Sequence, residues 1–138
     1  MSEPLLPDNR KLTWRDITEI MVGSCLLAFP VSVTEEVWTI SETLPFSRAL
    51  YLLIWSVIFI AFFTYHRYFN GCLKGHVGRF VIRVCAVHFT TLICCATILL
   101  AVNQLMTAET TSIAIKRVII VSFPASFAAT VVDGMSKD

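Results

Sequence analysis

Long apolar stretches alternate with short polar segments along this chain. Four stretches, at about residues 17–40, 47–65, 80–106 and 113–132, are mainly apolar. About 20 such residues cross the ~30 Å hydrocarbon layer of a bilayer as a helix, and a helix satisfies its backbone hydrogen bonds within itself. The pattern therefore predicts an all-α membrane protein with four transmembrane helices.

Short polar segments join the four predicted helices, for example at residues 41–46 and 106–112. Links this short place consecutive helices side by side and antiparallel. We therefore expect one transmembrane domain, residues 1–138, folded as an up-down bundle. A domain of this size is too small to enclose a large pore, so we also expect several copies to assemble as a homo-oligomer.

The composition supports a membrane setting and removes one class of partner. Hydrophobic residues make up 56% of the chain and charged residues 15%, and the mean hydropathy is +0.72. A water-soluble domain of this size could not bury so much apolar surface, so the lipid bilayer is the expected environment. A net charge of +1 provides no basic stripe to neutralise phosphates, so we expect no nucleic-acid partner.

Lysine and arginine are unevenly distributed between the two sides of the predicted bundle. One side carries Arg10, Lys11, Arg15, Arg67, Lys74, Arg79, Arg83 and Lys137, whereas the other carries Arg48, Lys116 and Arg117. Because cytoplasmic loops are enriched in these residues, the distribution predicts a multi-pass protein of the cell membrane with both termini in the cytoplasm. Trp14 and Tyr65 at the inner ends, and Trp38 and Tyr51 at the outer ends, agree with this orientation.

The first stretch contains the most polar segment of any predicted span. Glu35 and Glu36 lie near its outer end, and Ser32 and Thr34 precede them. Ionisable groups cost about 2.5 to 3.5 kcal/mol at a helix centre, so they indicate function by default. Pro30 removes a backbone donor below this segment and should kink the helix. One interpretation places the four polar residues along an ion path, with the carboxylates as the outer ring of a pore.

Two other interpretations of the glutamates remain open. Lys116 and Arg117 enter the fourth stretch at the same outer level, so they are candidate charge partners of Glu35 and Glu36. Alternatively, Glu36 and Trp38 lie at the level of the lipid headgroups with no partner. Pro124, in the middle of the fourth stretch, predicts a second helix kink.

One histidine falls within a predicted span. His88 lies in the third stretch, where a histidine either relays protons or packs as a hydrogen-bonded interior residue. His66 and His76 flank Cys72 in a link, but this spacing matches no standard ligand pattern, so we expect no metal ion and no cofactor. The five cysteines include no C-x-x-C pair and mostly fall in apolar runs, where cysteine behaves as a small hydrophobe.

Part of the chain resembles a known group of sequences. Residues 26–71 contain Leu-Leu-Ala-Phe-Pro-Val-Ser-Val-Thr-Glu-Glu-Val-Trp followed by Leu-Pro-Phe-Ser-Arg, and residues 123–126 read Phe-Pro-Ala-Ser. These features are similar to an uncharacterised prokaryotic family of integral membrane proteins. The residues that carry the similarity are Pro30, Glu36, Trp38 and Pro124. The resemblance implies a multi-span membrane fold and a bacterial or archaeal origin, and it implies no activity.

No catalytic arrangement is evident, so we expect a protein without enzymatic activity. The sequence contains no H-E-x-x-H motif, no Gly-rich phosphate loop and no nucleophile with a base at a useful spacing. The leading hypothesis is a homo-oligomeric, cation-conducting channel lined by the first span. The alternatives are a proton-coupled or small-solute transporter that uses Glu36 and His88, and a non-catalytic membrane adaptor or assembly subunit. The adaptor would pack on another membrane protein through small residues, such as Ala125, Ser126, Ala128 and Ala129.

Overall fold

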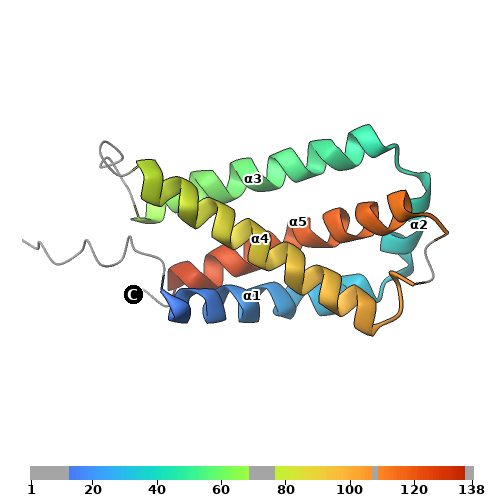
Figure 1. Cartoon of the computed structure of the whole chain (residues 1–138), viewed down its shortest axis with the longest axis horizontal. Helices are drawn as coiled ribbons and strands as arrows, with labels where there is room; N and C mark the ends of the chain where they lie inside the picture. Colours follow the sequence, from blue (N-terminus) through green and yellow to red (C-terminus); the bar gives the residue numbers. More distant parts are fainter. Residues whose placement is uncertain (1–12, 69–76, 107–108, 136–138) are drawn as a thin grey trace, which may run out of the picture.

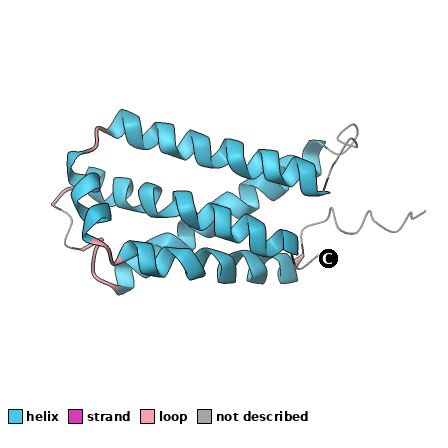
Figure 2. Ribbon diagram, turned by 180° about the vertical axis from the view of Figure 1, so that it is seen from behind, coloured by secondary structure: helices cyan, strands magenta, loops and turns pink. Residues whose placement is uncertain are grey.

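The structure, a computed structural model, describes residues 13–68, 77–106 and 109–135, which form helices joined by short loops (Figure 2). The helices are α1 (Trp14–Ser32), α2 (Glu35–Thr43), α3 (Phe46–Tyr68), α4 (Val77–Ala101) and α5 (Thr111–Met135). No strand occurs in the described part of the chain, which agrees with the predicted all-α class. Six residues used above lie outside the described residues: Arg10, Lys11, Cys72, Lys74, His76 and Lys137.

The four long helices run back and forth along the longest axis of the molecule (Figure 1). The start of α1, the end of α3, the start of α4 and the end of α5 lie together, at what we call the terminal end (Figure 1). The short helix α2 lies at the opposite end, the α2 end. By length and composition, α3, α4 and α5 can each cross a membrane, and the number of candidate spans becomes four if α1 and α2 form one bent span.

The first apolar stretch, predicted as a span at residues 17–40, is not one continuous helix. α1 ends at Ser32 and α2 begins at Glu35, and the two helices are bent by 82° relative to each other. Trp38 on α2 donates its indole N–H to the Ser32 carbonyl oxygen at 3.0 Å, which supports the bent arrangement. As a result, α2 turns away from the axis of α1.

The break follows from local chemistry near Pro30. Proline has no backbone N–H and therefore removes one hydrogen bond from the last turns of α1. The Thr34 hydroxyl donates to the Val31 carbonyl oxygen at 2.8 Å, and the Thr34 backbone is extended (φ −88°, ψ 140°) at the N-cap of α2. Pro124 has a different outcome, because α5 continues through it to Met135.

The helix from the third stretch, α4, ends five residues before the predicted boundary of the stretch at residues 80–106. Asn103 adopts a left-handed conformation (φ 65°). The Asn103 N–H donates to the Leu100 carbonyl oxygen (3.0 Å), and the Gln104 N–H donates to that of Leu99 (2.8 Å). This pair of hydrogen bonds forms a Schellman motif, and asparagine tolerates the left-handed region better than most residues. The motif ends the helix and turns the chain toward α5.

α5 is the central helix, because it packs against each of the other four helices. Its closest neighbour is α1: a Cβ added to Gly23 would lie 2.8 Å from both the Ala128 carbonyl oxygen and the Ala129 Cα. Small residues allow membrane helices to approach in this way. Ala125 and Ala129 are fully buried. The face of small residues that the sequence assigned to another membrane protein is therefore used inside this chain.

Candidate functional site

Three ionisable side chains from three different helices meet inside the terminal end. Arg83 of α4 contacts Asp16 of α1 (Nη1 to Oδ2, 3.4 Å) and Asp133 of α5 (Nη2 to Oδ2, 2.9 Å). The exposed fractions are 1% for Arg83, 0% for Asp16 and 2% for Asp133. Buried charges persist when they are paired and hydrogen-bonded, and in membrane helices they mark functional sites by default. We call these three residues the buried triad.

Local structure sets the position of each member of the triad. Asp16 belongs to a capping box: its N–H donates to Thr13 Oγ1 (3.3 Å), and the Thr13 N–H donates to Asp16 Oδ2 (3.1 Å). One carboxylate therefore both caps its helix and contacts Arg83. Arg83 is six residues inside α4, about 9 Å from the start of the helix, and Asp133 is two residues from the end of α5.

A third carboxylate, that of Glu19, lies beside the triad. The Glu19 side chain pairs with Arg15 at 2.9 Å. One carboxylate oxygen from each of Asp16, Glu19 and Asp133 lies within 4.8 Å of the other two, a spacing at which oxygen donors can hold a cation. Arg83 already contacts two of these three carboxylates, and its positive charge opposes the binding of a divalent metal ion. The absence of a metal site stays a prediction.

Arg67 attaches α3 at the same end of the bundle. Its guanidinium donates to the Gly134 carbonyl oxygen of α5 through Nε (3.0 Å) and Nη2 (2.8 Å). A Cβ at Gly134 would lie 3.0 Å from a ring atom of Phe63, so the absence of a side chain lets the two helices approach. Arginine side chains thus connect all four long helices at the terminal end.

A second buried cluster surrounds Arg117 of α5 at the α2 end. The Arg117 guanidinium donates to Ser41 Oγ (2.9 Å) and to the backbone and side-chain oxygens of Gln104 (2.6 and 3.2 Å). It also pairs with Glu42 Oε1 at 3.2 Å. The Arg117 side chain is 4% exposed, whereas that of Glu42 is 57% exposed. Arg117 therefore holds α2 and the loop after α4 against α5.

These contacts correct the charge pairing that the sequence suggested for Lys116 and Arg117. Lys116 donates to the Leu44 carbonyl oxygen at 2.8 Å, and Arg117 binds the partners just described. Glu35 and Glu36 are exposed and form no ion pair with any described residue. Because the helix breaks before Glu35, the first residues of α2 point outward and its later residues reach α5.

The predicted ion path along the first stretch is divided between two surroundings. Ser32 is fully buried and Thr34 is half-buried, and both hydroxyls donate to backbone carbonyl oxygens of α1. Glu35 and Glu36 instead line a shallow hollow of about 320 Å³ on the outside of α2. The four predicted residues are close in sequence but do not share one surface.

Buried polar side chains also occur between the two charged clusters. Ser24 of α1 and Thr91 of α4 share a hydrogen bond at 3.1 Å, and Ser56 of α3 donates to Ser126 of α5 at 3.1 Å. His88 is nine-tenths buried, and neither of its ring nitrogens has a hydrogen-bond partner among the described residues. His88 is therefore an interior residue, but without the hydrogen bonds of an ordinary packing histidine.

The sequence patterns do not identify the triad as a site. In the sequence analysis, Arg83 is only one of the basic residues on the predicted cytoplasmic side. Asp133 lies one residue beyond the predicted stretch at residues 113–132. Two local signals in the sequence nevertheless mark the two aspartates of the triad. Thr13 and Asp16 have the spacing of a capping box, which marks a helix start, and Asp133 follows directly on an apolar run. Only the packing of α1, α4 and α5 brings the three residues together.

The apolar helices and the charged clusters enclosed between them define the class of protein, an integral membrane protein of all-helical fold. The chain belongs to the family described as "Putative integral membrane protein (DUF2391)", which matches residues 3–132. This match confirms the family resemblance predicted from the sequence and extends it over nearly the whole chain. No curated protein and no solved structure matches the chain.

Proposed function

We propose that this chain is a proton-coupled membrane transporter for a small solute, with the buried triad as its proton-binding site. The observation that carries the proposal is the enclosure of Arg83, Asp16 and Asp133, each at most 2% exposed, in an integral membrane protein. Arg83 ties α4 to both α1 and α5 through these carboxylates, so the triad has a structural role whether or not it also binds a proton. What supports a role beyond structure is that three ionisable groups are buried at one place within a membrane protein, where such groups are costly.

The charge of the triad favours a proton as its exchangeable partner. With both carboxylates ionised, the three groups carry a net charge of −1, because one guanidinium faces two carboxylates. Two ionised carboxylates that share a site repel each other, and a proton on either one relieves that repulsion. Protonation of Asp16 or Asp133 makes the cluster neutral and weakens the attraction of Arg83 to that residue. Proton binding can thereby shift the balance between two helix arrangements.

Polar groups in the interior support a route between the two ends. On α1, Asp16, Ser24 and Ser32 are fully buried and recur every eight residues, about 12 Å along the helix. Thr91 is hydrogen-bonded to Ser24, and His88 precedes it by about one turn of α4. Aspartate and histidine are residue types that carry protons in transporters, and Asp16 and His88 are the members of this set that can do so. In this proposal the triad takes the place of the exposed Glu36 as the titratable partner of His88.

The proposed orientation places the terminal end in the cytoplasm of a cell membrane. Among the described residues, Arg15, Arg67, Arg79 and Arg83 belong to this end, and Arg48, Lys116 and Arg117 belong to the α2 end. The larger number of basic residues at the terminal end, four against three, supports the cytoplasmic assignment through the positive-inside rule. The triad then faces the cytoplasmic side, and α2 lies near the outer surface.

Charge movement after a pH jump tests the proposal. The purified protein is reconstituted into vesicles on a solid-supported electrode, and the current after an acidic jump is recorded without solute. We expect a transient current, because proton binding at the triad moves charge into the membrane. Asp16→Asn and Asp133→Asn should each abolish the transient. Glu36→Gln, which alters an exposed carboxylate, should leave it unchanged.

Circular dichroism of each variant shows whether it retains its helices, so that loss of current is not caused by unfolding. A transient of unchanged size in both aspartate variants would refute the proposal. The absence of a transient in the helical, unsubstituted protein would refute it as well. Fractions of water-soluble small molecules are then added, and the fraction that converts the transient into a sustained current contains the transported solute.

A homo-oligomeric cation channel is the second candidate, and the exposure of Glu35 and Glu36 favours it. In an oligomer, α2 helices from several copies can bring these carboxylates into a ring that concentrates cations. The outward side chains of α1 are apolar, for example Met21, Leu26 and Phe29, so α2 and not α1 would form the pore mouth. Unitary current steps in planar bilayers that vanish in the Glu35→Gln, Glu36→Gln double variant would favour the channel over the transporter.

The adaptor hypothesis has less support, because Ala125, Ser126 and Ala129 are buried against helices of the same chain.

The transporter proposal involves no covalent chemistry, since the proton moves reversibly between the triad and its surroundings. We therefore propose, as the sequence predicts, that the protein has no enzymatic activity.

A further inference from the structure

Lys116 of α5 is a buried cation that forms no ion pair with any described residue. Its side chain is 7% exposed, and its Nζ donates to the Leu44 carbonyl oxygen at 2.8 Å. An ammonium group carries three N–H donors, and Leu44 accepts from one of them. Buried charges in proteins are normally paired, and the two buried arginines, Arg83 and Arg117, both contact carboxylates. Lys116 therefore lacks the counter-ion that these arginines have.

The interior of the α2 end is positively charged. Arg117 follows Lys116 and is 4% exposed, whereas Glu42, its ion-pair partner, is 57% exposed. Two buried cations therefore face one half-exposed carboxylate, and these three groups carry a net charge of +1. Leu44 is the C-cap of α2, and the C-terminus of a helix offers about −0.5 of an elementary charge. That partial charge is too small to neutralise the cluster.

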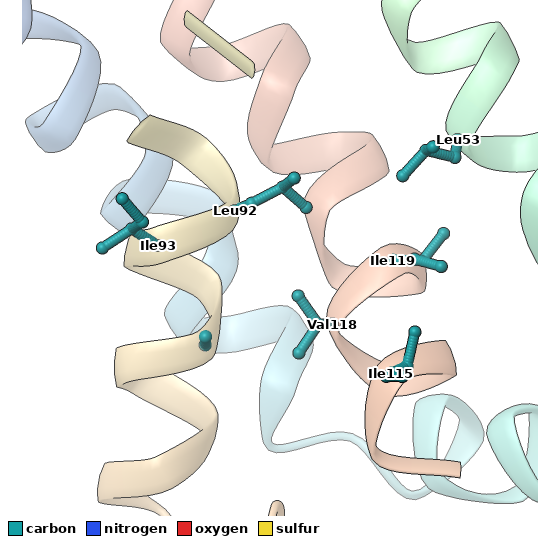
Figure 3. A pocket seen from close by; sticks show the side chains of 7 residues that line it. Leu53, Leu92, Ile93, Ile115, Val118 and Ile119 are labelled. Atoms are coloured by element: carbon teal, nitrogen blue, oxygen red, sulfur yellow. The ribbon is translucent and has the colours of Figure 1, made fainter. Parts of the chain in front are cut away.

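An apolar groove lies on another side of α5, between α3, α4 and α5 (Figure 3). The α5 residues that line it are Ile115, Val118 and Ile119, and the lining from α3 and α4 is aliphatic as well. Lys116 does not line this groove. Aliphatic walls offer no hydrogen bond to an anion, so a counter-ion of Lys116 has to lie on the side of Leu44 and the end of α2.

An anion with a single charge would complete the cluster. It would balance the net charge of +1, and it would accept the N–H donors of Nζ that Leu44 leaves unused. A lysine ammonium is a compact point charge and imposes no planar geometry on its partner, so charge and size select the anion. Leu44 and Pro45 form the short link between α2 and α3 at the α2 end. A small anion can therefore approach Lys116 where the Leu44 carbonyl oxygen now lies.

We propose that Lys116 binds a small, singly charged anion, which enters from the α2 end and is the solute that the protein transports. The binding site follows from the charge balance around Lys116, whereas the role of the anion as solute rests on the proton-coupled transport proposed above. The proton site and the anion site then lie at opposite ends of the bundle. When empty, they carry net charges of −1 and +1, so each ligand neutralises its own site.

Anion binding to the purified chain tests the inference. Thermal unfolding in a delipidating detergent, at low salt and fixed pH, is followed while sodium acetate, nitrate or chloride is added. We expect at least one of these anions to raise the unfolding temperature in a saturable manner, because a ligand that binds the folded state stabilises it. Lys116→Gln, which keeps an N–H donor for Leu44 but has no charge, should weaken binding by about tenfold, the equivalent of about 1.4 kcal/mol. Arg48→Gln, which removes an exposed cation at the same end, is the control and should leave the affinity unchanged.

Equal affinities of the unsubstituted chain and Lys116→Gln would overturn the binding site, and so would equal weakening by Arg48→Gln. The lack of saturable stabilisation by all three anions would overturn it as well. Native mass spectrometry identifies the source of the anion. An anionic phospholipid that the unsubstituted chain retains and Lys116→Gln loses would overturn the free solute in favour of a headgroup phosphate. If circular dichroism shows that Lys116→Gln has lost its helices, Lys116→Met provides an uncharged side chain with the same expected loss of binding.

Binding is measured without a pH jump, so the result does not depend on the proton site. The anion that binds is then added in the pH-jump measurement, where it should change the current of the unsubstituted protein. A bound anion without effect on this current would overturn its role as the solute. The absence of any transient would instead refute the transporter proposal and the solute role with it, whereas the binding site at Lys116 would stand.

Discussion

Arg83 Nη2 lies 2.9 Å from Asp133 Oδ2, although the two residues are 50 positions apart in the chain. The contact joins the second turn of α4 to the last turn of α5, and Asp16 brings α1 to the same guanidinium. One arginine therefore fixes the relative positions of three helices at the terminal end. The predictions below separate this structural role from a role in transport.

Arg83→Met should strongly destabilise the protein, because it leaves two carboxylates buried without their cation. Removing one partner of a buried ion pair costs about 3–5 kcal/mol. Thermal unfolding in detergent measures the loss, with Arg79→Met, an exposed arginine on the same helix, as the control. The triple variant Arg83→Met, Asp16→Asn, Asp133→Asn should recover most of the stability. A triple variant no more stable than Arg83→Met would show that the triad is not an electrostatic unit.

Gly23→Ala should separate α1 from α5. The added Cβ would lie 2.8 Å from backbone atoms of Ala128 and Ala129, which cannot move aside as a flexible side chain can. Overpacking of this kind costs about 1–3 kcal/mol. Gly78→Ala is the matched control, because no atom lies within 4 Å of its added Cβ and alanine favours a helix. Equal unfolding midpoints for the two variants would contradict the close packing of α1 and α5.

Arg117→Gln should loosen α2 from the end of the bundle. Cys95 provides a reporter, because it is fully buried in a cluster that includes Val37 of α2. The other cysteines, Cys25, Cys72, Cys85 and Cys94, are first replaced by alanine. We then expect Cys95 to react with a water-soluble maleimide about tenfold faster after Arg117→Gln, since hydrogen bonds to charged groups contribute about 1.5–3 kcal/mol each. Arg48→Gln, at the same end, should leave the rate unchanged; an equal increase would show that the effect is not specific to Arg117.

His88→Leu should leave the stability unchanged or raise it. A buried polar group without a hydrogen bond costs about 1–3 kcal/mol, and leucine removes that cost at a similar volume. Thermal unfolding in detergent measures this effect, and the pH-jump current measures the proposed proton relay separately. We expect a stable variant with a reduced current. A large loss of stability would instead reveal that His88 forms hydrogen bonds in the membrane.

Glu35→Gln and Glu36→Gln should each leave the unfolding temperature unchanged, because both side chains are exposed and unpaired among the described residues. Glu42→Gln should lower the free energy of unfolding by less than about 1 kcal/mol, and the unfolding temperature slightly, because its half-exposed pair with Arg117 is partly screened by solvent. Thermal unfolding of the three variants in one detergent makes the comparison. A larger effect at Glu35 or Glu36 than at Glu42 would restore the charge pairing suggested by the sequence.

The positions of the long helices follow closely from the sequence. α3, α4 and α5 overlap the stretches predicted at residues 47–65, 80–106 and 113–132, because an apolar run long enough to cross a bilayer can satisfy its backbone only as a helix. The sequence predicts that the helix is distorted near Ser32, but it does not predict the size of the bend. A proline indicates a distortion, but its size depends on neighbouring groups: Pro30 is followed by a turn of 82°, whereas α5 continues through Pro124.

The sequence by itself determined the class of this protein, since apolar composition and helical propensity are properties of local segments. Only the tertiary structure decided which charges meet. Arg83 contacts Asp16 and Asp133 across 67 and 50 residues, and Arg117 contacts Glu42 in place of Glu35 or Glu36. The physical reason is that ion pairing depends on how each helix is rotated and crossed against its neighbours. That geometry arises from close contacts such as Gly23 against Ala129 and from the bend between α1 and α2.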